Sequence, residues 1–179
     1  MKKLFGFILL AVTLAACAFA DIPAAEKAAS NELGALAGRT PLYSVENGHV
    51  GVVDLHDANL TKLPESIGNL SGLYLLNLSF NKITALPASF GNLKNLKWLY
   101  LGNNGLTSLP ESFGNLTALR TLELGDNNLT ALPASITKLK TNTWDKDSPD
   151  LRKNKLPVTE LQKLLSDDAA KKQAKKQRK

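Results

Sequence analysis

The sequence predicts an α/β solenoid, with a short-stranded parallel sheet on its concave face and turns or short helical turns on its convex face. A pattern of seven apolar positions recurs four times between Val50 and Thr141, at a constant period of 23 residues. A fixed period of this length is typical of solenoids, in which each copy packs against its neighbours. Within each copy, apolar and polar residues alternate over a few positions, as Leu76, Asn77 and Leu78 do. This alternation favours a short strand with one face buried.

Residues 1–20 have the pattern of a signal peptide for export. Lys2 and Lys3 precede an apolar core, and small residues follow it. The segment is too short, and wrongly flanked, for a permanent membrane-spanning helix. The sequence therefore predicts an exported protein, and its single cysteine excludes an intrachain disulfide.

Two cleavage sites compete in this segment. Residues 14–17 (Leu-Ala-Ala-Cys) resemble the lipobox of bacterial lipoproteins, in which Cys17 would become the lipidated first residue. Residues 18–20 (Ala-Phe-Ala) fit ordinary signal peptidase. Lipidation is favoured because the cysteine occupies the lipobox position, and a chance cysteine in an apolar segment is the alternative. The predicted location is the cell envelope, as a lipoprotein, and a soluble periplasmic or secreted protein comes second.

Residues 21–49 are expected to form a spacer and an N-terminal cap. The alanine-rich stretch from Ala24 to Leu36 is either a short helix or a spacer, ended by Gly38. Further on, Asn47-Gly48 lies between two apolar runs and predicts a tight hairpin turn. The second strand of this hairpin leads into the first repeat.

Residues 50–141 hold the four repeats. Asn81, Asn104 and Asn127 lie where strands end, and their amides can both donate and accept hydrogen bonds. We therefore expect an asparagine ladder that satisfies backbone groups inside the turns. The first copy has Ala58 there, as expected of an end repeat. A Leu-Pro pair in each copy, and a glycine in the first three, interrupt any long helix on the convex side.

Each copy follows the pattern apolar-x-x-apolar-x-Leu-x-x-Asn-x-Leu/Ile-x-x-Leu-Pro-x-Ser-Phe/Ile-x-x-Leu, apart from Ala58. This pattern resembles the leucine-rich repeat family over roughly half of the chain. The preceding hairpin is similar to the N-terminal cap of extracellular members, without the cysteines that such caps usually carry. The resemblance implies a leucine-rich repeat arc whose usual role is protein binding.

Residues 142–168 are expected to form a degenerate C-terminal cap. Residues 151–156 (Leu-x-x-Asn-x-Leu) can be aligned as a fifth strand and turn, but residues 156–157 (Leu-Pro) can equally be aligned with residues 132–133. The two alignments disagree, and both stay open. A helix beginning at the proline would place four apolar residues on one face: Val158, Leu161, Leu164 and Leu165. We expect Trp144 to cover the exposed edge of the core.

The net charge of +6 reflects the C-terminal tail, residues 169–179, whose last nine residues include six lysines and arginines. Clustered basic residues attract anionic lipid, lipopolysaccharide or nucleic acid. A disordered, solubilising end is the simpler interpretation and is favoured. Export argues against nucleic acid as a partner.

Residue patterns for catalysis or metal binding are missing from the sequence. His56 lies near Asp54 and Asp57, which could form a metal site or a catalytic pair, but three solvated side chains are the favoured interpretation. An enzyme needs a nucleophile, a base and an orienting group in one cleft. We find no Gly-rich phosphate loop or metal-spaced cluster. We therefore expect no enzyme activity, cofactor, metal or small-molecule substrate.

Residues that alternate with the inward leucines are expected to face the concave surface. Four of them, Leu75, Phe80, Trp98 and Tyr100, should form an exposed cluster rimmed by charge, which is typical of a binding hot spot. The predicted partner-binding residues are Tyr74, Leu75, Asn77, Phe80, Lys97, Trp98, Tyr100, Arg120 and Glu123. The alternative is that the aromatic rings shield a small sheet or rest against a terminal segment.

The sequence thus predicts a monomeric, exported, non-catalytic protein that binds a protein partner through its concave sheet. The rival hypothesis is an envelope structural protein that binds a cell-wall or anionic lipid component through its lipid anchor and basic tail.

Overall fold

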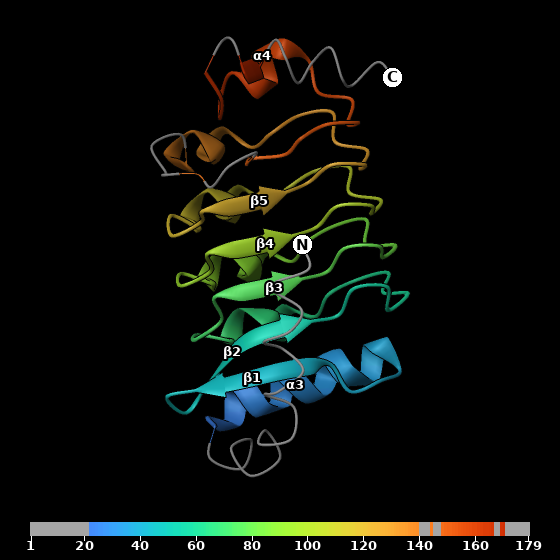
Figure 1. Cartoon of the computed structure of the whole chain (residues 1–179), viewed down its shortest axis with the longest axis vertical. Helices are drawn as coiled ribbons and strands as arrows, with labels where there is room; N and C mark the ends of the chain where they lie inside the picture. Colours follow the sequence, from blue (N-terminus) through green and yellow to red (C-terminus); the bar gives the residue numbers. More distant parts are fainter. Residues whose placement is uncertain (1–21, 140–143, 145–147, 167–168, 171–179) are drawn as a thin grey trace.

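The computed structural model describes residues 22–139, 144, 148–166 and 169–170. Strands are stacked one above another along its long axis, between helix α3 at one end and helix α4 at the other (Figure 1). The helices and strands are α3 (Ala24–Ala37), β1 (Leu42–Glu46), β2 (His49–Asp54), β3 (Leu75–Asn77), β4 (Trp98–Tyr100), β5 (Thr121–Glu123) and α4 (Val158–Leu161). The 3₁₀ helices are η2 (Glu65–Asn69), η3 (Ala88–Asn92), η4 (Glu111–Asn115) and η5 (Ala134–Leu139). The predicted α/β solenoid is confirmed.

The five strands form one open sheet in the order β1-β2-β3-β4-β5. β1 is antiparallel to β2, whereas β2 to β5 are parallel and in register, so Val53, Leu76, Leu99 and Leu122 form one row. Each of these four side chains is 0% exposed. Burying one such side chain stabilises a fold by about 1.5–3 kcal/mol. The repeats therefore share a continuous apolar core.

The asparagines at the strand ends hold neighbouring turns together. The Asn81 carbonyl oxygen accepts hydrogen bonds from the backbone N–H groups of Ala58 at 3.0 Å and Leu60 at 2.9 Å. Its amide nitrogen donates to the carbonyl oxygens of Leu55 and Leu78, both at 2.9 Å. Similar bonds recur at Asn104, Asn127 and Asn154. Each asparagine reaches back to the preceding turn, so the first copy, with Ala58, has no earlier turn to bond.

The convex side is built from 3₁₀ helices that lie very close together. The Ser112 hydroxyl donates to the backbone oxygen of Ala88 at 2.6 Å, and the same bond joins Ser89 to Glu65 at 2.6 Å. A Cβ atom placed on Gly91 would lie 2.3 Å from the backbone oxygen of Ser112. Glycine is therefore required at this position because the next helix leaves no room for a side chain.

The N-terminal cap consists of α3 and the β1–β2 hairpin. α3 is capped by Gly38, whose φ of 62° is left-handed, and the hairpin turns through Asn47 and Gly48, with φ of 52° and 75°. Two successive positive φ angles suit the tight turn that an Asn-Gly pair favours. The stretch that could have been a spacer is thus a helix of 14 residues.

The C-terminal end contains a fifth strand-like turn. The backbone N–H of Leu124 donates to the oxygen of Asp150 at 2.8 Å, and the N–H of Leu129 donates to the side-chain oxygen of Asn154 at 3.0 Å. The structure therefore follows the alignment of residues 151–156 with the repeat. The expected longer helix is wrong: α4 ends at Leu161, although Leu164 and Leu165 beyond it are buried.

Trp144 is partly buried and packs against the core. The predicted signal peptide, with Cys17 and both cleavage sites, and residues 171–179 of the predicted basic tail lie outside the described residues. The prediction that the disordered tail begins at residue 169 is wrong, because Ala169 and Ala170 are helical and Ala170 is 0% exposed in the core. Within the described ranges, no helix has the length and hydropathy needed to cross a membrane.

Candidate functional site

The face of the sheet opposite the leucine core, here called the concave face, presents two in-register rows of side chains. Val52, Leu75, Trp98 and Thr121 form the first row. Asp54, Asn77, Tyr100 and Glu123 form the second row, and a single bridge extends it to Asp150. Neighbouring strands lie about 4.8 Å apart, so successive residues of a row are within side-chain reach of one another.

Tyr74 joins the N-terminal cap to the repeats. Its hydroxyl donates to the Glu46 carboxylate at 2.6 Å, and its ring meets Trp98 edge to face, with centroids 5.9 Å apart. A Cβ on Gly51 would lie 2.6 Å from the Tyr74 ring, so the ring packs directly on the hairpin backbone. Burial, followed by the bond to Glu46, raises the pKa of Tyr74. This predicted binding residue therefore has a structural role in the free protein.

The apolar residues predicted to be exposed differ sharply in accessibility. Phe80 is 61% exposed, whereas Leu75 is only 9% exposed. Trp98 and Tyr100 are partly buried. Leu75 lies on the concave face but between Val52 and Trp98 in its row. The expectation that Leu75 would be an exposed anchor is therefore not met, because neighbours in adjacent strands cover short side chains.

Phe80 has an unusual backbone conformation as well as high exposure. Its φ is 59°, in the left-handed region, and the equivalent turn residues Asp57, Asn103 and Asp126 have φ of 50°, 56° and 57°. Aspartate and asparagine tolerate this region, but a bulky residue there is an outlier. The sequence alone already indicates that Phe80 is unusual, because it occupies the position at which two other repeats have aspartate and one has asparagine. The conformation shared by these turns became visible only in the structure.

The last residue of several strands has a local hydrogen-bonding role. The side-chain oxygens of Asp54, Asn77 and Asp150 accept the backbone N–H two residues later, at 3.0, 3.1 and 3.0 Å. The only side-chain oxygen of Tyr100 is at the far end of its ring, too distant to accept this N–H. In the described structure, the Glu123 carboxylate does not accept the equivalent N–H. Tyr100 and Glu123 thus depart from the local chemistry of the repeat at adjacent positions.

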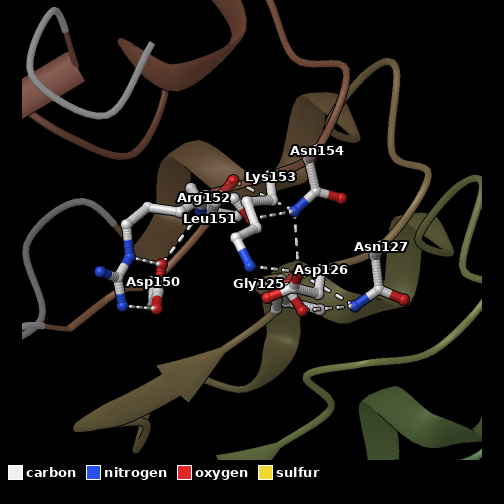
Figure 2. A network of polar contacts seen from close by, with 9 residues as sticks. Gly125, Asp126, Asn127, Asp150, Leu151, Arg152, Lys153 and Asn154 are labelled. Carbon is white, nitrogen blue, oxygen red and sulfur yellow. Dashed lines mark hydrogen bonds and ion pairs between the residues drawn. The ribbon is translucent and has the colours of Figure 1, made fainter. Parts of the chain in front are cut away.

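Two ion pairs, Asp150–Arg152 and Asp126–Lys153, lie near the end of β5 (Figure 2). The Arg152 guanidinium donates to both oxygens of Asp150, at 2.8 and 2.5 Å. Lys153 forms an ion pair with Asp126 at 2.9 Å. Glu123 is exposed as a residue, but partial desolvation of its carboxylate raises its pKa. The negative charge of Asp150 raises this pKa further, whereas the positive charge of Arg152 lowers it.

Lys97 and Arg120 occupy equivalent positions, each immediately before a strand of the sheet, and both are exposed. They lie at the opposite ends of β4 and β5 from Tyr100 and Glu123. A basic residue therefore precedes each of β4 and β5, whereas β2 and β5 end in an acidic residue.

Asp54 does not fit the favoured interpretation of a solvated residue. Its side chain is 4% exposed, and its carboxylate bonds the His56 ring nitrogen at 2.8 Å. Asp57 is exposed, as expected. The contact between Asp54 and His56 is local to one turn, and the Asp54 carboxylate is buried against that turn. Over the described ranges, no group of three or more histidine, cysteine, aspartate or glutamate residues could hold a metal ion.

Comparison with known proteins identifies the repeats. The leucine rich repeat family model matches residues 49–106 and, overlapping them, residues 72–129. No curated protein sequence matches the chain.

Several solved structures are similar. A leucine-rich repeat protein of Leptospira interrogans is 38% identical, with a TM-score of 0.48, over 59% of this chain and 32% of that chain. The present chain thus spans about a third of that protein. The leucine-rich repeat ectodomain of the receptor kinase SOBIR1 from Arabidopsis thaliana is 24% identical, with a TM-score of 0.57, over 68% of this chain and 77% of that chain. The BIR2 ectodomain from Arabidopsis thaliana is 26% identical, with a TM-score of 0.53, over 64% of this chain and 62% of that chain. Together with the parallel sheet and the asparagine ladder, the family match shows that the repeats within residues 49–129 belong to the leucine-rich repeat family.

Proposed function

We propose that this chain is a non-catalytic, exported protein that binds a protein partner through its concave face. The observation that carries the proposal is Phe80, an aromatic side chain that is 61% exposed in a left-handed turn. An exposed aromatic residue in a strained conformation does not stabilise the free protein, and such outliers gather at functional sites. Aromatic residues are also enriched among interface hot spots.

The mechanism would be recognition by a preorganised surface. Hydrogen bonds of the asparagine ladder and the in-register strands hold the concave rows rigid, so little conformational entropy is lost on binding. Phe80, Trp98 and Tyr100 would supply apolar contact. The charged groups of Lys97, Arg120 and Glu123 would orient the partner and speed its association. Leu75 and Asn77 would support these contacts from within the rows, and Tyr74 from its position just before β3.

Export and membrane attachment are part of the proposal. The signal-like residues 1–20 support export, as does the similarity to the BIR2 ectodomain. Lipidation of Cys17 in a cell-envelope lipoprotein is our first choice, and a soluble periplasmic or secreted form is the second. We propose a monomer.

The test is site-specific photocrosslinking in intact cells. A photoreactive amino acid at Phe80 should give a discrete adduct with one protein, identified by mass spectrometry. The matched control is Leu36, an exposed apolar residue on α3, where the same reagent should give no such adduct. Equal labelling from both positions would contradict the proposal.

A second arm tests the rival function. Deletion of residues 171–179, which keeps the buried Ala170 in place, should leave the adduct at Phe80 unchanged. Adducts consisting only of lipid or cell-wall material, lost on this deletion, would support an envelope structural role instead.

A further inference from the structure

We propose that the partner inserts a lysine or arginine side chain beside Glu123 and Tyr100, and seats an apolar side chain on Phe80. This inference rests on the proposed function and names the chemistry of the partner: an extended protein segment with a basic and an apolar residue close together.

Nearby cations already have acidic partners. Figure 2 shows the Arg152 guanidinium directed at Asp150 and the Lys153 ammonium directed at Asp126. The Arg152–Asp150 pair uses two parallel hydrogen bonds, an arrangement that is strong and geometrically specific. In the described part of the chain, Glu123 has no ion pair of its own. It is therefore the carboxylate at this end of the concave face with unused capacity for a cation.

The position of Glu123 favours an incoming positive charge. Asp150 is its in-register neighbour on one side, so two carboxylates lie on adjacent strand positions. Like charges at this separation destabilise each other. A cation from a partner would relieve the repulsion and replace water lost by the crowded carboxylate. Arg152, which is bound to Asp150, offsets part of this repulsion, and a cation beside Glu123 would offset more of it.

Tyr100 is the in-register neighbour of Glu123 on the other side. An aromatic ring next to a carboxylate suits an ammonium or guanidinium group, which can contact the ring face and the carboxylate together. This also accounts for the two departures from the strand-end pattern, since Tyr100 and Glu123 stand where Asp54, Asn77 and Asp150 bond their own turns.

Phe80 lies in the turn three residues beyond the end of β3. Glu123 ends β5, so the two residues are separated by two strand spacings, roughly 9–10 Å across the sheet, and by an offset of three residues along the strand direction, up to about 10 Å. The combined distance is about 10–14 Å, which an extended segment covers in about three to four residues. The basic and apolar residues of the partner are thus expected about three to four positions apart.

The experiment uses random peptides displayed on phage as the probe. We expect the purified protein to enrich sequences that combine lysine or arginine with an apolar residue a few positions away. One enriched peptide is then synthesised, and its dissociation constant is measured for each variant at low and high salt. The Glu123→Gln variant keeps the shape and removes the charge, so affinity should fall about tenfold, with the melting temperature unchanged or raised.

Asp57→Asn is the matched control. It makes the same change of charge, at an exposed turn position where asparagine tolerates the left-handed backbone, but in the repeat on the far side of Phe80 from Glu123. Its affinity should stay within about twofold of the unmodified protein, since a distant exposed charge contributes little. Raised salt should weaken peptide binding by the unmodified protein, and it should have less effect on peptide binding by the Glu123→Gln variant.

The outcomes separate this inference from the proposed function. If the enriched peptides are acidic or uncharged, or if Glu123→Gln binds as tightly as the unmodified protein, the cation site is wrong. Loss of binding in Phe80→Ala would then still support the concave face as the binding surface. If neither substitution weakens binding, or if no peptide is enriched, both the inference and the proposed function fail.

Discussion

The carboxylate of Glu26 joins the cap helix to the cap hairpin and the first repeat. It is 1% exposed and accepts hydrogen bonds from four groups: the His49 ring, the Val50 N–H, and the Ser71 N–H and hydroxyl. Burial alone would raise its pKa, but these hydrogen bonds more than offset that effect and lower the pKa below 4.5. A single residue of α3 therefore couples the cap to the solenoid through its charged form.

Replacing Glu26 with glutamine should destabilise the protein at neutral pH by about 1–3 kcal/mol, since hydrogen bonds to a charged group are lost. Because the folded-state pKa is lowered, the stability from Glu26 is present above its ordinary pKa of 4.5 and is lost as the pH falls through the folded-state value. Urea unfolding at a series of pH values measures both effects. The difference between the variant and the unmodified protein should shrink in acid.

Glu32→Gln on the same helix is the control. Glu32 is exposed and accepts one hydrogen bond, from Ser66. Its substitution should change the free energy of unfolding by less than about 1 kcal/mol. Equal losses of unfolding free energy in the two variants would show that the buried hydrogen bonds of Glu26 stabilise the protein no more than the exposed bond of Glu32.

The 3₁₀ helices of the convex side depend on their spacing. Gly91→Ala would place a methyl group 2.3 Å from the Ser112 backbone oxygen, so η3 and η4 would have to move apart. We expect a loss of about 1–3 kcal/mol, the usual cost of overpacking. Gly105→Ala is the control, because its nearest neighbour would be the Thr84 methyl at 3.4 Å. Thermal melting should show a lower midpoint for Gly91→Ala alone; equal midpoints would mean that the convex side can relax.

The elements differ in how far the sequence predicts them. Strand positions, the asparagine ladder and the absence of long convex helices follow from the period, because identical local chemistry recurs in each copy. The length of α4 does not follow: residues 164 and 165 are buried without being helical. An apolar pattern requires burial there, but burial can be achieved by a helix or by a turn.

The candidate site is less predictable than the fold. Which residues share the concave face follows from the alternation of the strands, yet the exposure of each depends on its lateral neighbours. Leu75 is covered in this way, and Phe80, in the turn beyond its strand, is not. The role of Glu26 could not be predicted either, because its partners lie 24 and 45 residues away.

The whole molecule is stabilised mainly by contacts between neighbouring repeats, so the position of a defect along the solenoid should matter. Leu99→Asp would bury an unpaired charge in the row between Leu76 and Leu122. An uncompensated buried charge costs several kcal/mol, comparable with the total stability of a small domain. We expect Leu99→Asp to abolish the cooperative thermal transition measured by circular dichroism.

Leu156→Asp introduces the same charge at the C-terminal end, where the side chain is 4% exposed. In a solenoid the ends interact with a neighbour on one side only, so this variant should unfold its last turn and keep a transition for the remaining repeats. Thr107→Asp, at an exposed position, should melt like the unmodified protein. A normal melt for Leu99→Asp would refute the shared core, whereas complete unfolding of Leu156→Asp would show that the repeats fold as one indivisible unit rather than as coupled neighbours.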